Sequence, residues 1–366
     1  MAKHAVPLKK PAPDCERFIG SLMGEAMPER PPLIEYIVDE AVRRPITSEL
    51  LGREWVCPAP DDRAAQDAYW DNFIEFWYRM GYDFVRLEIG LPFPRPIVVG
   101  TDCTTLAQTR AWADEHHGAI ESQADADSYA WPDIEAMDFS PLEYVSTHLP
   151  DGMGLITNHA GGPFEIVTTI MSYERFCLAL CDDIGLVLAM CERVGSLLEA
   201  YYRHLVHLPN VIALFQGDDM GFRSGPLASP DILRSLFLPW HQRFAGLAHE
   251  HGVPYFLHSC GDVSSIMEDL ISTVGIDGKH SFEDAIISAP QFQARYGDRI
   301  ATLGGVDINV LAAASPQRVQ AYTRAQISAC ASRGRYAVGS GNSIPSYIPV
   351  ENYLAMLDTA LTWQLA

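Results

Sequence analysis

The feature that most constrains the fold of this chain is a series of short apolar runs that alternate with helical segments. Apolar runs of about 4–8 residues are typical of buried strands, and helical stretches between them indicate βαβ units around a parallel sheet. The expected strands are residues 82–90, 154–159, 211–219, 253–260, 275–282, 300–307 and 336–342. These seven strands, with an eighth hidden in the first half of the chain, predict an α/β fold of the (β/α)8 TIM barrel type.

The segments between the expected strands carry the start signals of helices. Ser229 and Ser315 each stand before a proline, which gives an N-cap serine followed by a proline at the first helical position. The long helical segment 172–205 is expected to break near 183–185. A doubly wound open sheet is the alternative, but it normally carries a glycine-rich phosphate turn after its first strand. We find no G-x-G-x-x-G in a strand–helix context and no P-loop.

The chain of 366 residues shows no internal repeat, low-complexity tract or Gly/Ser linker. Single α/β barrels reach this length, so we expect one barrel domain over residues 15–366. Residues 15–80 are expected to form a helical extension of that domain. Residues 1–14 contain lysines and prolines but no apolar core of a secretory signal, and we expect them to form a mobile N-terminal arm.

The composition excludes several classes of protein. The chain has 26 basic and 47 acidic side chains and a formal charge of −21. Nucleic-acid binding is not expected, because phosphate contacts need clustered Lys and Arg. A membrane is not expected as a partner either, since no apolar stretch approaches the roughly 18–20 residues that span a bilayer. The eight cysteines lack the spacing of a disulfide framework, which favours a reducing, cytoplasmic location.

Nearly every expected strand ends in polar residues of the types that bind ligands or transfer protons. In a barrel, the carboxyl ends of the strands and the loops after them converge on one mouth, where the chemistry takes place. The alternative is that polar residues simply mark the ends of strands. The strand-end residues are Arg86, Glu88, Asn158, His159, Asp218, Asp219, His258, Cys260, Lys279, His280, Asp307, Ser340 and Asn342.

The stretch "YFLHSCGDV" places two good metal ligands at the end of one strand. His258 and Cys260 flank a single residue, so the alternation of a strand points both side chains the same way. Imidazole and thiolate together suit zinc, and a catalytic zinc needs about three protein ligands. His280 and Glu283 in "KHSFED" are candidates for the missing ligand, and Asp219 is another. The alternative is a hydrogen-bonded histidine beside a cysteine that only packs.

Asp218 and Asp219 are adjacent, so on a strand their side chains face opposite ways. We expect one to enter the mouth and the other to brace the backbone of a loop. A carboxylate in the mouth can anchor a substrate or act as an acid/base. Lys279 is expected either to neutralise a substrate carboxylate or to pair with Glu283 or Asp284.

Several blocks of the sequence resemble the uroporphyrinogen decarboxylase superfamily, and more specifically its branch of cobalamin-dependent methyltransferases. They cover roughly residues 150–360 in the expected order, and the resemblance implies a (β/α)8 barrel. The decarboxylases proper hold a tetrapyrrole through an arginine-rich segment of the "RQAGRY" type. Here the corresponding region reads "RPPLIEYIVDEAVRRPITSELLGREW", which argues against porphyrinogen decarboxylation. The matching blocks are "GGPFEIVTTIMSYERF", "GDDMGFRSGPLASPDILRSLFLPWHQRFAGLAHEHGVPYFLHSCGDV", "RYGDRIATLGGVDINVL" and "GSGNSIPSYIPVENYLAML".

The methyltransferase branch binds zinc through an H-x-C pair and a later cysteine in a "GCG" turn. His258 and Cys260 match the pair, whereas Ser340 stands where the later cysteine is expected. The resemblance then implies either loss of the metal or a different ligand set completed by His280 or Glu283. Oxygen and nitrogen ligands would make zinc a better Lewis acid toward an ether or alcohol, so we expect a small oxygen-bearing substrate.

The resemblance implies a zinc-dependent, corrinoid-linked methyltransferase that acts on a small methylated or methyl-accepting substrate. The chain lacks a "D-x-H-x-x-G" motif, so the corrinoid is expected on a partner protein, and relatives suggest a homodimer. One alternative is a metal-free decarboxylase-like lyase of a small carboxylate or tetrapyrrole-type substrate, in which Asp219 stabilises a developing cation. Another is a silent barrel that only binds a ligand. The expected roles are catalytic for Asp219, His258 and Lys279, metal-binding for His258, Cys260, His280 and Glu283, and substrate-binding for Glu88, His159, Asp218, Asp307, Ser340 and Asn342.

Overall fold

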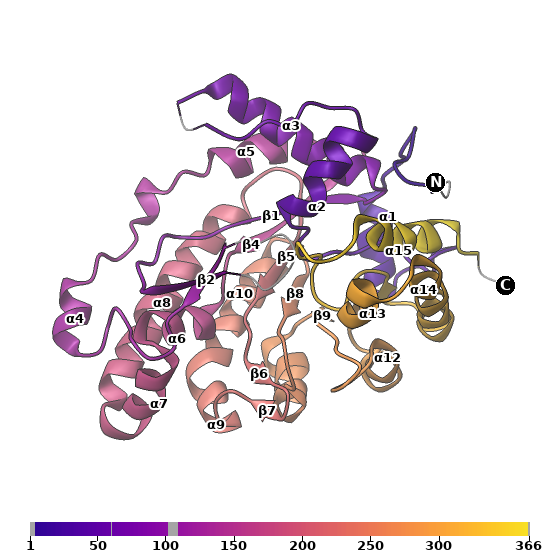
Figure 1. Cartoon of the computed structure of the whole chain (residues 1–366). Helices are drawn as coiled ribbons and strands as arrows, with labels where there is room; N and C mark the ends of the chain where they lie inside the picture. The colour runs from indigo at the N-terminus through magenta and orange to yellow at the C-terminus, as the bar shows by residue number, and fades with distance from the viewer. Residues whose placement is uncertain (1–3, 60, 102–108, 365–366) are drawn as a thin grey trace.

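A computed structural model of the chain describes residues 4–59, 61–101 and 109–364. Its centre is a curled seven-stranded sheet surrounded by helices (Figure 1). Every neighbouring pair of strands in this sheet is parallel, as the alternation of strands and helices predicted. In spatial order the strands are β1 (Phe84–Ile89), β4 (Gly154–His159), β5 (Val211–Gly217), β8 (Tyr255–His258), β9 (Gly278–His280), β10 (Ala301–Leu303) and β11 (Tyr336–Ala337).

The strands form where the sequence is continuously apolar, because helices cover the outer face of a parallel sheet and both faces are buried. β4, β8 and β10 are buried along their whole length. Two helices begin at the expected signals: Ser229 and Ser315 accept hydrogen bonds from the first turns of the helices that start at Pro230 and Pro316. The expected break near 183–185 is confirmed, since one helix ends at Asp182 and the next begins at Ile184.

The helices surround the central sheet (Figure 1). The helices are α1 (Cys15–Leu22), α2 (Glu40–Pro45), α3 (Arg63–Arg79), α4 (Gln123–Ser128), α5 (Ser140–Thr147), α6 (Pro163–Met171), α7 (Tyr173–Asp182), α8 (Ile184–Leu205), α9 (Pro230–Ile232), α10 (Leu238–Glu250), α11 (Met267–Asp269), α12 (Ala289–Tyr296), α13 (Ile308–Ala313), α14 (Pro316–Cys330) and α15 (Val350–Thr362). Within the described ranges, none of these helices is both long enough and apolar enough to cross a bilayer.

A closed barrel of eight strands is not confirmed, because the sheet has β1 and β11 as its two edges. Residues 33–38 lie beside the β11 edge and are the nearest counterpart to the hidden eighth strand. Leu33 bridges to Val338 and Val38 bridges to Ile344, both in the parallel sense. The segment follows two prolines, 31 and 32, which have no N–H group to offer a ladder. Among the described residues, the segment pairs with this edge at these two bridges, and the side chains of Glu35 and Tyr36 are buried.

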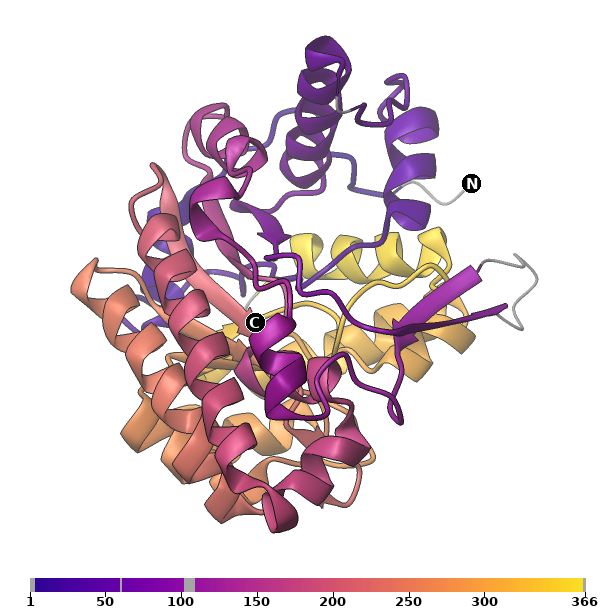
Figure 2. The ribbon, with the colours of Figure 1, turned by 90° about the vertical axis from the view of Figure 1, so that its left-hand side faces the viewer.

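Two small antiparallel hairpins complete the structure. β2 (Ile97–Thr101) pairs with β3 (Thr109–Ala113), and Figure 2 shows this purple hairpin projecting from the body. β6 (Gly221–Phe222) pairs with β7 (Gly225–Pro226) directly after β5, near the carboxyl ends of the central strands. We predicted neither hairpin from the sequence.

The N-terminal residues pack against the rest of the chain from residue 4 onward. Val6 is buried, and the backbone N–H of Leu8 donates to the carbonyl of Arg79 in α3 at 2.8 Å. Residues 1–3 of the expected arm lie outside the described part. The division into an arm, an extension and one barrel domain stays a prediction.

Candidate active site

The candidate site lies where β5, β8 and β9 end. Parallel pairing aligns Gly217 with His258, and His258 with His280, so the carboxyl ends of these three strands lie level. Residues that follow such strands enter the same region, which is where α/β folds place their ligands. The loop after β5 supplies Asp219, and the loop after β8 supplies Cys260.

Three side chains converge there with atoms that can bind a metal ion. One atom each from Asp219, His258 and Cys260 lies within 4.8 Å of the other two. Cys260 Sγ is 3.3 Å from His258 Nε2, and Asp219 Oδ1 is 3.6 Å from the same nitrogen. The backbone N–H of Cys260 donates to Asp219 Oδ1 at 2.8 Å, which holds the carboxylate beside the thiol. The structure thus brings together the H-x-C pair and one of the three residues expected to complete it.

His280 lies behind His258, on the side away from Cys260. The two Nδ1 atoms are 2.8 Å apart, and His280 Nε2 is 3.2 Å from the carbonyl oxygen of Ser340. Burial lowers the pKa of His280 to about 3, and it lowers the pKa of His258 well below its ordinary value. The charge of Lys279 lowers both pKa values further. Both imidazoles are therefore neutral near pH 7, which is the form that binds metals.

Two polar side chains from other strand ends approach the sulfur of Cys260. Asn342 Nδ2 donates to Sγ at 3.2 Å, and Ser281 Oγ donates to it at 3.5 Å. Burial raises the pKa of the Cys260 thiol to about 12, and the Asp219 carboxylate raises it as well. A bound cation would reverse this, because a coordinating thiol loses its proton. Ser281 has a φ of 80°, a strained conformation for a residue with a side chain and one that clusters at functional sites.

Asp218 faces away from the cluster, as expected for two adjacent strand-end residues. Its oxygens accept the backbone N–H groups of Phe164 at 3.1 Å and Glu165 at 2.8 Å, at the start of α6. His241 Nε2 lies 2.8 Å from Asp218 Oδ2 in a fully buried pair. Asp218 therefore fixes α6 to the end of β5, and Asp219 is the member of the pair that enters the site.

Glu165 adds a carboxyl group that our reading of strand ends missed. It lies in the first turn of α6, where it accepts the backbone N–H of Gly162 at 3.3 Å. Burial raises the pKa of Glu165 well above its ordinary value, and the carboxylates of Asp219 and Asp218 raise it further. Burial also raises the pKa of Asp219. When two neighbouring carboxyl groups disfavour each other's charge, one of them keeps its proton to a higher pH. Glu165 is therefore a candidate proton donor. The block "GGPFEIVTT" was the signal that contained it.

A buried arginine closes the other side of the region. Arg86 on β1 donates to Glu88 Oε2 at 2.9 Å and to the carbonyl of Phe215 at 3.1 Å. The Tyr36 ring stacks on His258, with ring centroids 4.2 Å apart, and lies 4.8 Å from the Arg86 guanidinium carbon. Asn158 Nδ2 donates to the same Glu88 oxygen at 3.3 Å. Glu88 is thus held in a polar network at the end of β1, and its substrate-binding role stays a prediction.

Lys279 is buried beneath the loop after β8. Its Nζ donates to the carbonyl of Ser259 at 3.3 Å and to that of Ser281, and it lies 4.7 Å from the Phe282 ring. Burial lowers the pKa of Lys279 to about 8, although the nearby Cys260 and Asp219 oppose this. The first two contacts make Lys279 a brace of the loop backbone.

The remaining predicted residues are engaged with other parts of the chain. His159 is buried: Leu91 N–H donates to its Nε2 at 2.7 Å, and its Nδ1 lies 3.0 Å from the carbonyl of Gly161. Asp307 caps α13, where it accepts Asn309 N–H at 2.8 Å. Ser340 Oγ donates to buried Glu35 at 2.6 Å. Glu283 is exposed and is not a member of the metal-binding group.

The comparison with protein families supplies the decisive observation. A family model described as "Uroporphyrinogen decarboxylase (URO-D)" matches residues 120–363, which is two thirds of the chain. The chain belongs to this family. The resemblance noted in the sequence is thereby confirmed. No curated protein sequence matches this URO-D family member significantly.

One solved structure with a similar fold supports this assignment. A methyltransferase from Methanosarcina mazei superposes with a TM-score of 0.67 at 16% identity, covering 95% of this chain and 98% of the other. At this identity the likeness shows the fold alone. An intracellular xylanase from Thermoanaerobacterium saccharolyticum, as a mutant complex with xylotetraose, has a TM-score of 0.42 at 9% identity and covers 91% of this chain and 89% of its own. So distant a likeness carries no argument.

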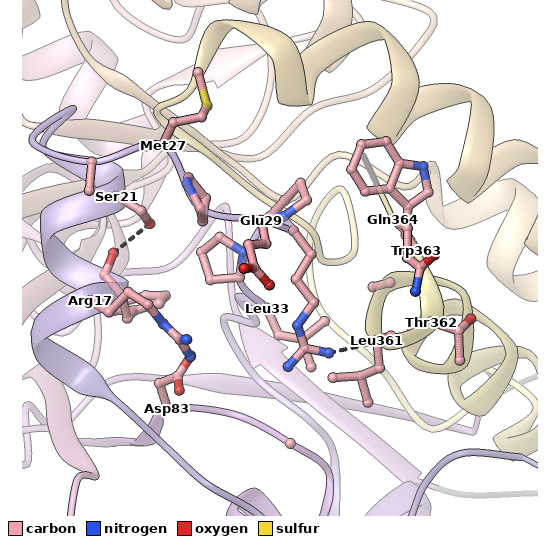
Figure 3. A pocket seen from close by; sticks show the side chains of 18 residues that line it. Arg17, Ser21, Met27, Glu29, Leu33, Asp83, Leu361, Thr362, Trp363 and Gln364 are labelled. Atoms are coloured by element: carbon pink, nitrogen blue, oxygen red, sulfur yellow. Dashed lines mark hydrogen bonds between the residues drawn. The ribbon is translucent and has the colours of Figure 1, made fainter. Parts of the chain in front are cut away.

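Two cavities of this URO-D family member differ in their position relative to the candidate site. One, of about 200 Å³, adjoins the candidate site and is lined by Gly261, Asp262 and Lys279 among others. The larger, of about 820 Å³, lies far from it, between the N-terminal segment and the end of α15. Figure 3 shows Arg17 and Asp83 pointing toward each other on one side of this larger cavity and Trp363 on the other. Lys279 and the loop that follows Cys260 line the smaller cavity, so this cavity lies beside the candidate site.

The donor set fits zinc. Zinc sites combine imidazole nitrogen, thiolate sulfur and carboxylate oxygen, and catalytic sites use three protein ligands with a fourth position left open. His258, Cys260 and Asp219 supply one atom of each kind, and Asp219 is partly exposed, with 38% of its side-chain area accessible. The exposed side of the cluster leaves an approach for a substrate.

Proposed function

We propose that this URO-D family member is a zinc-dependent, corrinoid-linked methyltransferase that acts on a small oxygen-bearing substrate. The observation that carries the proposal is the convergence of His258, Cys260 and Asp219 within 4.8 Å at the carboxyl ends of parallel strands. These three residues would hold the metal. When bound, zinc would supply a Lewis acid that polarises an oxygen atom or lowers the pKa of a bound nucleophile.

The chain's own residues would do the rest of the work. Asn342 and Ser281 donate to the Cys260 sulfur and would disperse its negative charge. Burial raises the pKa of Glu165, so this residue keeps its proton to a higher pH than an ordinary glutamate. It could therefore give that proton to an ether oxygen as the bond to the methyl group breaks. Glu88, held by Arg86, faces the same region.

The corrinoid would arrive on a separate protein that docks at the carboxyl-end face of the sheet. The homodimer and the cytoplasmic location also stay predictions. For the fold, we propose that residues 33–38 complete the barrel as an irregular eighth strand, which the two bridges to 338 and 344 support.

The first test is the zinc content of protein purified without chelator and without a nickel tag, measured by mass spectrometry. Wild-type protein should hold about one zinc per chain, and His258→Ala, Cys260→Ala and Asp219→Ala should each lose most of it. Cys57→Ala is the matched control, because Cys57 is an exposed cysteine outside the cluster. Full zinc in the His258→Ala variant would remove our ligand assignment.

The second test is methyl transfer from a panel of methoxylated compounds to reduced free cobalamin, followed through the corrinoid spectrum. Zinc-loaded wild-type protein should form methylcobalamin with at least one donor, and the Cys260→Ala protein should not. A zinc-free protein that releases CO₂ from small carboxylates would instead support the decarboxylase-like alternative. A protein that binds ligands without either reaction would be the silent barrel.

A further inference from the structure

A chain of hydrogen bonds runs from a buried carboxyl group to the candidate metal ligand. Glu35 Oε1 accepts the hydroxyl of Ser340 at 2.6 Å, and Glu35 Oε2 accepts the Ser340 backbone N–H at 3.2 Å. The Ser340 carbonyl oxygen lies 3.2 Å from His280 Nε2. His280 Nδ1 lies 2.8 Å from His258 Nδ1. Four residues from four separate segments are therefore connected by successive contacts, and the last of them, His258, belongs to the candidate metal cluster.

The Ser340 carbonyl fixes which atom donates and which accepts in each of the following hydrogen bonds. A carbonyl oxygen can only accept, so His280 must carry a proton on Nε2. The ring of His280 is fully buried and packs against the rings of Tyr36 and Phe215. A neutral ring with its proton on Nε2 has a bare Nδ1, which accepts. His258 must then carry its own proton on Nδ1, and its Nε2 is left bare.

The bare nitrogen is the one that faces the cluster. His258 Nε2 lies 3.3 Å from Cys260 Sγ and 3.6 Å from Asp219 Oδ1. The other tautomer would place a proton there and block a metal ion. Histidine ligands of metals usually donate their second N–H to an outer group that fixes the tautomer and orients the ring. In this protein the outer group is a second histidine, His280.

The backbone around the chain of bonds is shaped to permit it. Gly304 follows β10 with a φ of 77°, and an added Cβ there would collide with the Ser340 carbonyl oxygen and approach His280 Nε2 to 3.1 Å. The Tyr36 ring stacks on the face of the His258 ring and limits how far that ring can turn. The serine hydroxyl is turned to Glu35, so Ser340 supports the site through its backbone and is not itself a ligand.

From these contacts we infer that His280 is a positioning residue: held by Ser340 and Glu35, it sets the tautomer of His258 and leaves Nε2 free to bind zinc. This deepens the proposed function and rests on it for the identity of the metal. The tautomer itself is a property of the protein without metal, so it can be tested separately.

Two amide substitutions separate the two ends of the His280 ring. His280→Asn keeps a hydrogen-bonding oxygen near the position of Nδ1 and can still accept from His258. His280→Gln keeps a donor near the position of Nε2 and loses that acceptor. The Ser340 carbonyl also accepts Gly305 N–H at 2.9 Å, so it is not left unpaired in either variant.

The affinity for zinc is measured by competition with a chromogenic chelator. We expect a loss of roughly 10- to 100-fold for His280→Gln and for His280→Leu, and a loss of only a few fold for His280→Asn. Equal affinity of wild-type and His280→Gln protein would overturn the inference. Thermal unfolding of the zinc-free variants verifies that each is folded.

The tautomer is read from nitrogen-15 NMR of histidine-labelled, zinc-free wild-type protein, with the His258 signals assigned by their loss in His258→Ala. The inference requires the proton on Nδ1 of His258 in wild type, and a proton on Nε2 would refute it. If wild-type protein binds no zinc while this tautomer is present, the zinc assignment fails and the positioning role of His280 stands.

Discussion

Glu35 makes the stability of this protein depend on pH in a direction opposite to that of an ordinary surface carboxylate. It is fully buried, and burial raises its pKa from the ordinary 4.5 to about 7. Hydrogen bonds from Ser340 and from the backbone of Tyr36 oppose the rise without cancelling it. Among the groups that shift this pKa in the described ranges of the chain, none is a cation.

The sign follows from proton binding. Between the unfolded and the folded pKa, the folded state holds a proton that the unfolded state has released. The free energy of unfolding is therefore highest below the unfolded value and falls as the pH rises through the folded value. The full change is about 3 kcal/mol, from about 1.4 kcal/mol for each of the roughly 2.5 units between 4.5 and 7. Between about pH 5.5 and pH 8.5 about 2 kcal/mol of it is lost.

The test compares Glu35→Gln with wild type by urea unfolding at several pH values. The variant cannot ionise at this position, so the difference between the two unfolding free energies should change by about 2 kcal/mol over that range, with wild type losing stability relative to the variant. Glu49→Gln, at an exposed glutamate in the same half of the chain, is the control. A difference that stays constant with pH would show that Glu35 is already ionised at pH 5.5 and would refute the reasoning.

Two further substitutions test how the backbone holds the site. Gly304→Ala should lower the free energy of unfolding by at least about 2 kcal/mol, because the φ of Gly304, 77°, is left-handed and the added methyl group would collide with the Ser340 carbonyl oxygen. Urea unfolding measures this loss, and an unchanged free energy of unfolding would contradict the close approach. His159→Phe should lower the free energy of unfolding by about 2–4 kcal/mol, because it leaves the Leu91 N–H and a loop carbonyl without their buried partner. Thermal unfolding measures this loss, and a lower zinc content of the variant would instead indicate a role of His159 in the site.

The apolar runs predicted the central strands closely because their signal is local. The run 154–159 coincides with β4, and 211–219 contains β5 with the two aspartates just beyond its end. The last run, 336–342, contains only the two residues of β11, because the chain turns away at its glycines. The segment 33–38 was missed since prolines precede it and Glu35 interrupts its apolar pattern. Its place depends on contacts with residues some 300 positions away.

The candidate site divides in the same way. The spacing of His258 and Cys260 predicted their common direction, because two-residue alternation is a property of the strand itself. The adjacency of Asp218 and Asp219 likewise predicted their opposite roles. Glu165 was missed because it reaches the region from the first turn of a helix, and we considered only strand ends. Which neighbour each side chain meets is decided by the register between strands, which no local pattern contains.

Ser340 stands at the position where the resemblance to the methyltransferase branch implies a third zinc-binding cysteine. A serine at this position would be a poor zinc ligand, and its hydroxyl is bound instead to Glu35 at 2.6 Å. If zinc is bound as we propose, two features would take the part of a third thiolate. Asp219 has an oxygen within reach of His258 and Cys260, and His280, which contacts the Ser340 carbonyl, would orient His258. A carboxylate in place of a thiolate leaves zinc less electron-rich and a stronger Lewis acid. Under the proposed function, this ligand set would favour an ether or alcohol oxygen over a thiol as the substrate atom.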